Sequence, residues 1–236
     1  MMRFAPPPGY KRIQVVGSFE ELISTPFCDG VNALCWPREL PGDFEEVVRC
    51  LGPIEGITTL EDERIHALSL SAAGCIARDI LLQDVERLRS ADLSPNLDCI
   101  RSAPRDLSGA PIPRDVYSWH ADSATGPADT FLCAYNTAAS EGLRNEDAIR
   151  RADVPETRAE LLTLFGGADD HDFEEFLTEN FYDLHYLPAP GAQPFSFGLG
   201  NLWRVATDYP DSPVPPCIHR APTTSPGTLP RLLLIS

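Results

Sequence analysis

The clearest periodic pattern of apolar positions lies between Ala72 and Arg89. Its apolar residues recur three and four positions apart, and they are Ile76, Ile80, Leu81, Val85 and Leu88. Charged residues fill the other positions, so the pattern predicts one apolar stripe on an α-helix. We expect this helix to pack on a sheet.

A shorter helix is predicted directly after Asp43, whose carboxylate can cap the free N–H groups of a first turn. Apolar residues at positions 44, 47, 48 and 51 have helical spacing, and Gly52 with Pro53 ends the pattern. The preceding run 31–36 is predicted to be a strand, because it is short, mostly apolar and ended by Pro37.

Short apolar runs between Pro- and Gly-rich turns dominate the second half of the chain. The predicted strands are 115–122, 130–136, 195–199, 202–206, 216–220 and 231–235. The acidic stretch 141–182 interrupts them and is predicted to be mainly helical. Short strands with such turns are typical of a β-sandwich or jelly roll. The predicted fold class is therefore α+β.

We expect one domain over residues 13–236, preceded by a flexible N-terminal arm over 1–12 that contains three consecutive prolines. Within the domain, residues 13–110 form an α/β extension with the N-terminal helices. Residues 111–236 form the jelly-roll core, with 141–182 as its helical insertion. We expect that insertion to lie over the mouth of the core or beside it, as a lid.

Charge and composition narrow the classes of partner. The chain has 236 residues and a formal net charge of −16, which opposes binding to nucleic acid or to an anionic membrane. No apolar run approaches the ~20 residues that span a bilayer, and no apolar signal segment follows the N-terminus. We therefore expect a cytoplasmic protein. Lys11 is the only lysine, so a catalytic lysine is excluded at every other position of the chain.

Several kinds of site are disfavoured by missing motifs. The seven cysteines show no C-x-x-C spacing, which argues against a zinc ribbon and favours buried free thiols. The chain has no G-x-S-x-G motif, and the glycines at 198 and 200 lack a third glycine and a following helix. The acidic run 169–175 is predicted to be a solvated helix start rather than a metal site.

Two histidines and one carboxylate form the candidate metal site. His120 and Asp122 make an H-x-D motif, and residues i and i+2 of a strand point to the same side. This pair is two thirds of the 2-His-1-carboxylate triad of non-haem iron oxygenases, which leaves three metal positions open. His219, in a short strand-like segment near the C-terminus, is the candidate third ligand.

Arg231 is the candidate anion binder. It opens the apolar run 232–235, and a guanidinium at the start of a buried strand is costly unless it meets an anion. A dicarboxylate would satisfy it through two hydrogen bonds. Arg220 is a competing anion binder, but on a strand it would face away from the site because it directly follows His219. Tyr117 is likewise expected to face away.

The H-x-D motif, the distant histidine and the arginine about one hairpin later resemble the Fe(II)/2-oxoglutarate-dependent oxygenase superfamily. The segments Thr130–Tyr135 and Asn32–Arg38 are similar to a branch of that group. The resemblance covers residues 110–236, and it implies a cupin-like double-stranded β-helix. It also implies that the two histidines and the aspartate bind Fe(II), and that Arg231 pairs with the distal carboxylate of 2-oxoglutarate.

The resemblance implies hydroxylation or desaturation of a substrate, because a halogenase of this class would lack the carboxylate ligand of Asp122. Tyr135 is a candidate hydrogen-bond donor to the cosubstrate, with a role as a core tyrosine as the alternative. The expected substrate is a small molecule, such as an amino acid derivative or a secondary metabolite, although a protein substrate stays open. A monomer or a homodimer is expected.

Three alternatives stay open at this point. The short motifs can be unrelated parts of a jelly roll or sandwich. The protein can be a metal-binding cupin-like enzyme that does not use 2-oxoglutarate, in which case Arg231 has a structural partner. It can also be a non-catalytic jelly-roll protein whose acidic surface binds a basic partner.

Overall fold

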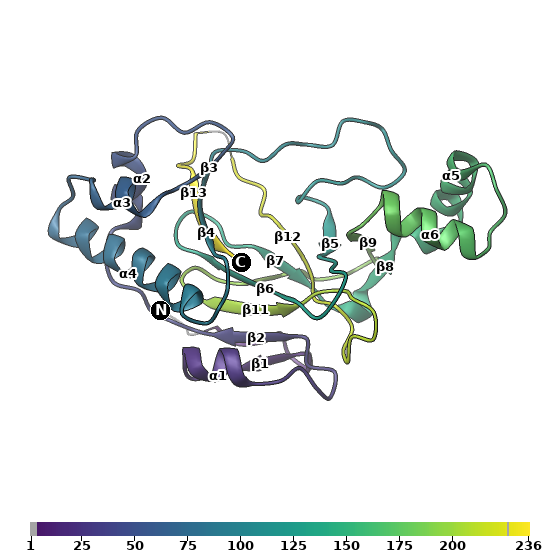
Figure 1. Ribbon diagram of the computed structural model, residues 1–236, viewed down its shortest axis with the longest axis horizontal. Helices are drawn as coiled ribbons and strands as arrows, with labels where there is room; N and C mark the ends of the chain where they lie inside the picture. The colour runs from purple at the N-terminus through teal and green to yellow at the C-terminus, as the bar shows by residue number, and fades with distance from the viewer. Residues whose placement is uncertain (1–3, 226) are drawn as a thin grey trace.

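The computed structural model describes residues 4–225 and 227–236, and within them the fold is α+β, as predicted. Two β-sheets face each other, and helices cover the outer face of the larger sheet (Figure 1). Of the described helices, none is long and apolar enough to cross a membrane.

The larger sheet has seven strands and is curled into a half-barrel, so its strands change direction steadily across Figure 1. In spatial order they are β1 (Ile13–Val15), β2 (Ala33–Trp36), β11 (Leu202–Ala206), β6 (Asp129–Ala134), β13 (Arg231–Ile235), β4 (Asn96–Ile100) and β3 (Ile57–Thr59). The β1–β2 pair is parallel, and the other pairs are antiparallel.

The smaller sheet has six strands, all paired antiparallel. In spatial order they are β10 (Phe195–Ser196), β7 (Glu141–Leu143), β12 (Ile218–Arg220), β5 (Trp119–Ala121), β9 (Leu184–Pro188) and β8 (Ala148–Arg150). From β4 onward the chain passes repeatedly between the sheets. It places β4, β6, β11 and β13 side by side in the larger sheet and β5, β7, β10 and β12 side by side in the smaller one.

The helices fall into two groups (Figure 1). Those packed on the larger sheet are α1 (Phe19–Ser24), α2 (Phe44–Cys50), α3 (Asp62–His66) and α4 (Ala72–Arg89). The other two, α5 (Pro155–Phe165) and α6 (His171–Asn180), share a small apolar core of their own. Two short 3-10 turns, Asn145–Asp147 and Arg151–Asp153, flank β8.

The larger sheet separates two apolar cores, because successive strand residues point to opposite faces. In β13, Leu232 and Leu234 belong to the core beneath the helices, whereas Leu233 belongs to the core between the two sheets. In β6, Cys133 and Leu132 divide in the same way. This alternation decides which residues of these strands can reach a site between the sheets.

The strongest sequence patterns agree with the observed elements. The predicted helix 72–89 is confirmed at both ends, and the Ser71 hydroxyl caps it by accepting the N–H of Gly74. Asp43 caps α2 by accepting the N–H of Glu46. The strand predictions 202–206 and 231–235 are also confirmed.

Other predictions differ from the structure. The strand predicted over 115–122 covers only 119–121, because the carboxylate of Asp115 accepts the N–H groups of Tyr117 and Ser118 and folds that part into a turn. The segment 141–182 was predicted to be mainly helical, and it contains α5 and α6, but its first part, 141–150, differs. It forms β7 and β8, whose backbone groups pair with β10, β12 and β9.

The described part of the predicted N-terminal arm lies against the sheets. The ring of Phe4 contacts Trp203 edge-on, and the buried Tyr10 donates its hydroxyl hydrogen to Asn145 Oδ1 at 2.9 Å. Residues 1–3 of the predicted arm lie outside the described residues. The α/β extension 13–110 contributes β1 to β4 to the same sheet as the C-terminal strands, so the two parts share one core.

Candidate metal centre

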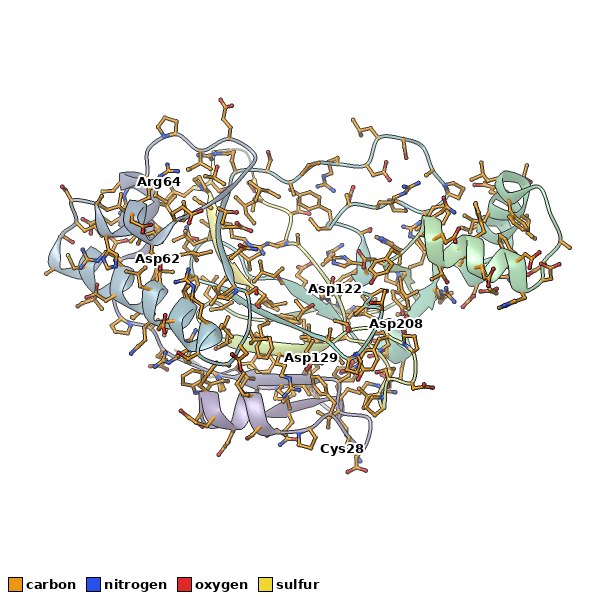
Figure 2. All side chains as sticks on the ribbon, in the orientation of Figure 1. Cys28, Asp62, Arg64, Asp122, Asp129 and Asp208 are labelled. Atoms are coloured by element: carbon orange, nitrogen blue, oxygen red, sulfur yellow. The ribbon has the colours of Figure 1, made fainter. Side chains whose placement is uncertain are left out.

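Two histidines and an aspartate converge where β5 and β12 pair. His120 and His219 are directly opposite each other in the antiparallel register, with ring centroids 4.6 Å apart. Asp122 follows β5 and, labelled in Figure 2, lies in the middle of the molecule. One ligand atom from each of the three residues lies within 4.8 Å of the other two. The structure therefore brings together the three predicted metal ligands.

Backbone carbonyls fix the orientation of both imidazole rings. Nδ1 of His120 lies 2.9 Å from the carbonyl oxygen of Ser118, and Nδ1 of His219 lies 3.3 Å from that of Cys217. A carbonyl can only accept, so each Nδ1 carries the hydrogen, and in a neutral imidazole this leaves the lone pair on Nε2. Histidine ligands of metals are commonly oriented by such outer partners.

Asp122 completes the donor set between the two Nε2 atoms. Its Oδ1 lies 3.7 Å from Nε2 of His120, and its Oδ2 lies 3.8 Å from Nε2 of His219. Thr130 donates its hydroxyl hydrogen to Oδ2 at 2.6 Å and so holds the carboxylate. These nitrogen–oxygen separations exceed a hydrogen bond, and they suit ligands that each lie roughly 2.0–2.2 Å from one shared ion.

The electrostatics of the group also favour a cation. Burial by itself raises the pKa of Asp122, but the neighbouring His219 and His120 imidazoles and the Thr130 hydroxyl outweigh it and hold that pKa below its ordinary value. Burial lowers the pKa of His219 and so favours its neutral form. A carboxylate and two neutral imidazoles are the protonation states that bind metal.

The donor set therefore fits a divalent transition metal. Two imidazole nitrogens and one carboxylate oxygen on one side of an ion leave its remaining positions open to other ligands. Such open positions are characteristic of catalytic metal sites, whereas structural zinc sites are filled by four protein ligands. Within the described residues, this is the one cluster of His, Cys, Asp or Glu side chains with metal-binding geometry.

His185 borders the metal centre but is not part of it. It pairs with His120 across β5 and β9, and its Nδ1 lies 2.7 Å from the hydroxyl oxygen of Ser118. Burial, with a smaller contribution from His120, lowers the pKa of His185 to about 4. His185 is therefore a buried side chain beside the candidate ligands.

A cavity of about 210 Å³ opens onto the three ligands. Its apolar wall comes from residues of β4, β6 and β13 that face the smaller sheet, namely Ile100, Leu132, Leu233 and Ile235. Arg231 lines the same cavity, as predicted, because it shares the face of β13 with Leu233. The alternation of β13 thus puts its single charge on the side of the metal ligands.

Arg231 is a buried cation without a partner among the described residues. Its exposed fraction is 7%, and its Nε has no hydrogen-bond acceptor there. Burial lowers the pKa of Arg231 to about 10, and Tyr117 offsets this only in part. Transfer of an unpaired charge out of water is unfavourable. The cavity therefore provides a binding position for an anion.

Arg220, the competing anion binder, is already neutralised. Its Nε donates to Oε2 of Glu141 at 2.7 Å, and its guanidinium stacks on the ring of Trp119 at 4.2 Å. It does not line the cavity of the metal ligands, which agrees with the prediction that it faces away.

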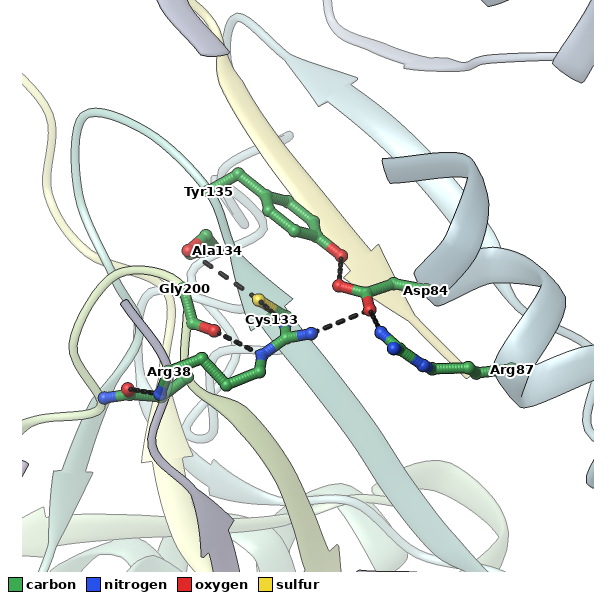
Figure 3. Close-up of polar contacts among 8 residues, drawn as sticks. Arg38, Asp84, Arg87, Cys133, Ala134, Tyr135 and Gly200 are labelled. Atoms are coloured by element: carbon green, nitrogen blue, oxygen red, sulfur yellow. Dashed lines mark hydrogen bonds and ion pairs between the residues drawn. The ribbon is translucent and has the colours of Figure 1, made fainter. Parts of the chain in front are cut away.

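Tyr135, predicted as a candidate cosubstrate donor, lies outside the site. Its side chain packs in the helix-covered core, stacked on Phe44, and its hydroxyl donates to Oδ2 of Asp84 at 2.8 Å (Figure 3). The alternation of β6 explains this placement, because Tyr135 shares a face with Cys133 and not with Leu132 of the cavity wall. This position matches the alternative role, that of a core tyrosine.

Tyr117 belongs to the cavity wall, so the expectation that it faces away is wrong. That expectation extended the strand alternation back from His120, but residue 117 precedes β5 and lies in the turn held by Asp115. Its hydroxyl oxygen accepts the N–H of Ala103 at 3.0 Å, which ties the turn to the loop after β4. The sequence pattern does not show that Tyr117 reaches the cavity, because this depends on the path of the turn.

The helical part of 141–182 does not cover the cavity. None of its described residues lines the cavity, and α5 and α6 project from the end of the molecule beyond β8 and β9 (Figure 1). The acidic run 169–175 begins α6, with Asp170 as its cap, so the predicted helix start is confirmed. The lid predicted for this segment is therefore not seen.

Comparison with known proteins gives no match for this chain. No protein-family model matches it, and no curated protein or solved structure shows significant similarity. The function is therefore inferred from the fold and from the chemistry of the cavity.

Proposed function

We propose that this protein is an Fe(II)/2-oxoglutarate-dependent oxygenase that hydroxylates or desaturates a small molecule. The observation that carries the proposal is the shared cavity of Arg231 and the three candidate ligands His120, Asp122 and His219. A metal centre with open positions and an unpaired buried cation together fit a cosubstrate that chelates metal at one end and carries a carboxylate at the other.

The chain path supports the jelly-roll core that this superfamily resemblance implies. Four adjacent strands of the larger sheet and four adjacent strands of the smaller one follow one another along the chain from β4 to β13, and the chain changes sheet between successive members of this set except from β7 to β10. An eight-stranded pair of antiparallel sheets is the architecture of jelly rolls and cupins. The strands β1, β2 and β3 then extend the larger sheet, and β8 and β9 extend the smaller one.

The residues of this chain have separable roles in the proposed reaction. His120, Asp122 and His219 would hold Fe(II), which together with 2-oxoglutarate and O2 supplies the oxidising chemistry when bound. Thr130 and the carbonyl partners of the two histidines hold the donor atoms in place. The apolar cavity wall excludes water from the reacting atoms.

Arg231 would orient the cosubstrate. A planar guanidinium matches a carboxylate through two charge-assisted hydrogen bonds, each contributing about 1.5–3 kcal/mol. Because the fork is fixed at the start of β13, it also determines which end of the cosubstrate faces the metal. An ammonium in its place would keep the charge but lose the bidentate geometry.

The test measures Fe(II) and 2-oxoglutarate binding separately under nitrogen, by calorimetry and by visible charge-transfer absorption. Arg231→Leu should weaken 2-oxoglutarate at least about tenfold and leave Fe(II) affinity within about twofold, and Arg231→Lys should recover part of the loss. Succinate release with O2 should follow the same order. Arg220→Leu is the matched control and should behave like the unmodified protein.

Two outcomes would contradict the proposal. If 2-oxoglutarate binds equally well to the Arg231→Leu variant, this arginine does not bind the cosubstrate. If the unmodified protein binds Fe(II) but not 2-oxoglutarate, the protein is instead a metal-binding cupin-like enzyme that does not use 2-oxoglutarate.

A further inference from the structure

A second hollow of about 260 Å³ adjoins the cavity of the metal ligands. The two share the wall residues Arg101, Ser102, Tyr117 and Thr224, so the inner cavity continues outward into this hollow. Pockets for small ligands typically enclose roughly 300–1,000 Å³. The inner cavity of about 210 Å³ is below that range, and a cosubstrate with a substrate therefore needs the outer hollow as well.

The outer hollow has the chemistry of an anion site. Arg101 and Arg105 line it, and no carboxylate oxygen of the described residues lies within 4.0 Å of either guanidinium. Arg101 donates to the carbonyl oxygen of Thr228 at 2.6 Å, and Arg105 lies over the ring of Tyr117 at 3.5 Å. Hydroxyl groups complete the wall, from Ser102, Thr223, Thr224, Ser225 and Thr228.

These cations gather at one place in a strongly acidic chain. The formal net charge is −16, yet Arg101, Arg105 and the inner Arg231 all line the two connected hollows without a carboxylate partner among the described residues. Asp98 also lines the inner cavity, and its Oδ1 accepts the hydroxyl hydrogen of Thr59 at 2.6 Å. A local positive cluster attracts anions even on a negative protein, because the field near the surface is set by the nearest charges.

Apolar side chains make up much of the wall of the inner cavity, which Arg101 and Arg231 also line. This wall contains apolar side chains of β4, β6 and β13, and two further lining residues, Ile57 and Val116, are about half exposed. An apolar group bound there would cover these side chains and remove them from water. The two hollows thus offer an apolar channel with a cationic entrance.

On the premise of the oxygenase function proposed above, we propose that the substrate is an amphiphilic organic acid. Arg101 and Arg105 bind its carboxylate or phosphate group in the outer hollow, and its apolar portion extends inward to the metal ligands. This arrangement presents a carbon atom to the metal centre at a fixed distance from the acid group. Arg231 remains available to 2-oxoglutarate.

The experiment measures ligand binding to the metal-free protein by calorimetry, so that it does not depend on Fe(II) or 2-oxoglutarate. The probes are straight-chain carboxylates from butanoate to octanoate, hexyl phosphate, and neutral hexanamide. At least one acid should bind about fivefold or more tightly than hexanamide, and salt should weaken its binding. Whichever binds more tightly, the carboxylates or hexyl phosphate, identifies the acid group of the substrate.

Variants locate the acid group. Arg101→Gln with Arg105→Gln should abolish the preference for the acid, whereas Arg78→Gln removes one charge from α4, which packs on the other face of the larger sheet, and should keep it. Arg231→Leu should also keep it. If none of the acids binds better than hexanamide, or if only Arg231→Leu abolishes the preference, the proposal is wrong. These outcomes leave the 2-oxoglutarate test with Arg231 unaffected.

Discussion

The two faces of the larger sheet each bury an arginine, with opposite consequences. Arg38 follows β2 and lies on the side of the helices, and Arg231 opens β13 on the side of the cavity. Arg38 donates to Asp84 Oδ1 at 2.7 Å and to the carbonyl oxygen of Gly200 at 2.8 Å, and its Nη2 lies 3.4 Å from the sulfur of Cys133 (Figure 3). Arg231 has no such partners among the described residues.

The pKa shifts of the two arginines record this difference. Burial acts to lower the pKa of Arg38, but Cys133 and Asp84 raise it above its ordinary value. Burial lowers the pKa of Arg231 to about 10, and no carboxylate reverses the effect. A buried charge with complete internal partners holds elements together. A buried charge that opens onto a cavity without partners indicates a ligand site.

Replacing Asp84 is the strongest test of this difference between the two arginines. This fully buried residue of α4 accepts hydrogen bonds from Arg38, Arg87 and Tyr135. Asp84→Asn leaves the Arg38 guanidinium buried without a counter-charge, which should lower the free energy of unfolding by about 3–5 kcal/mol. Urea unfolding followed by tryptophan fluorescence measures the change.

The matched variant is Arg231→Met on the other face. It removes a buried charge that has no internal partner, so the free energy of unfolding should stay within about 0.5 kcal/mol or rise. A loss comparable to that of Asp84→Asn would mean that Arg231 has a structural role, and the contrast between the faces would not hold.

Removing a candidate metal ligand should have the next largest effect. His219→Ala should lower Fe(II) or Mn(II) affinity by more than about a hundredfold, because even changes in outer partners of metal ligands cost 10–100-fold. Calorimetry under nitrogen measures the affinity, and circular dichroism checks that the fold is retained. His171→Ala is the control, since this histidine is exposed at the start of α6. Equal affinity in the two variants would exclude the assigned site.

Replacing Thr130 should have the smallest effect, and one that is confined to metal affinity. Its hydroxyl orients Asp122 from β6, in the larger sheet, and Thr130→Val keeps the shape while removing that hydrogen bond. Metal affinity should fall about tenfold with little change in stability. Thr207→Val is a control of the same chemistry, since that hydroxyl donates to the carbonyl oxygen of Ala128. If the two variants bind metal alike, Thr130 does not position the ligand.

The candidate site could be predicted because strand alternation acts over two residues. The spacing of His120 and Asp122 places both side chains on one side regardless of the rest of the fold. The charge of Arg231 before an apolar run likewise indicates a buried cation. The same reasoning fails at Tyr117, because a turn interrupts the alternation, and at Tyr135, because the sequence does not say which face of β6 meets the helices.

Several strands were not predicted because their patterns are weak. β3 is three residues long and largely exposed, and β4 alternates Asn96 and Asp98 with buried Leu97 and Cys99 inside a polar stretch. Such segments become strands by pairing with a neighbour that is distant in sequence, here β13 for β4.

The sequence by itself determined the helix 72–89, the strands at 202–206 and 231–235, and the residue types of the candidate metal centre, because these depend on local spacing and polarity. Tertiary structure decided that β12 pairs with β5 and so brings His219 to His120. It also decided that Glu141 neutralises Arg220 while Arg231 stays free of internal partners among the described residues. Pairing and burial depend on contacts between distant segments, and no local pattern specifies them.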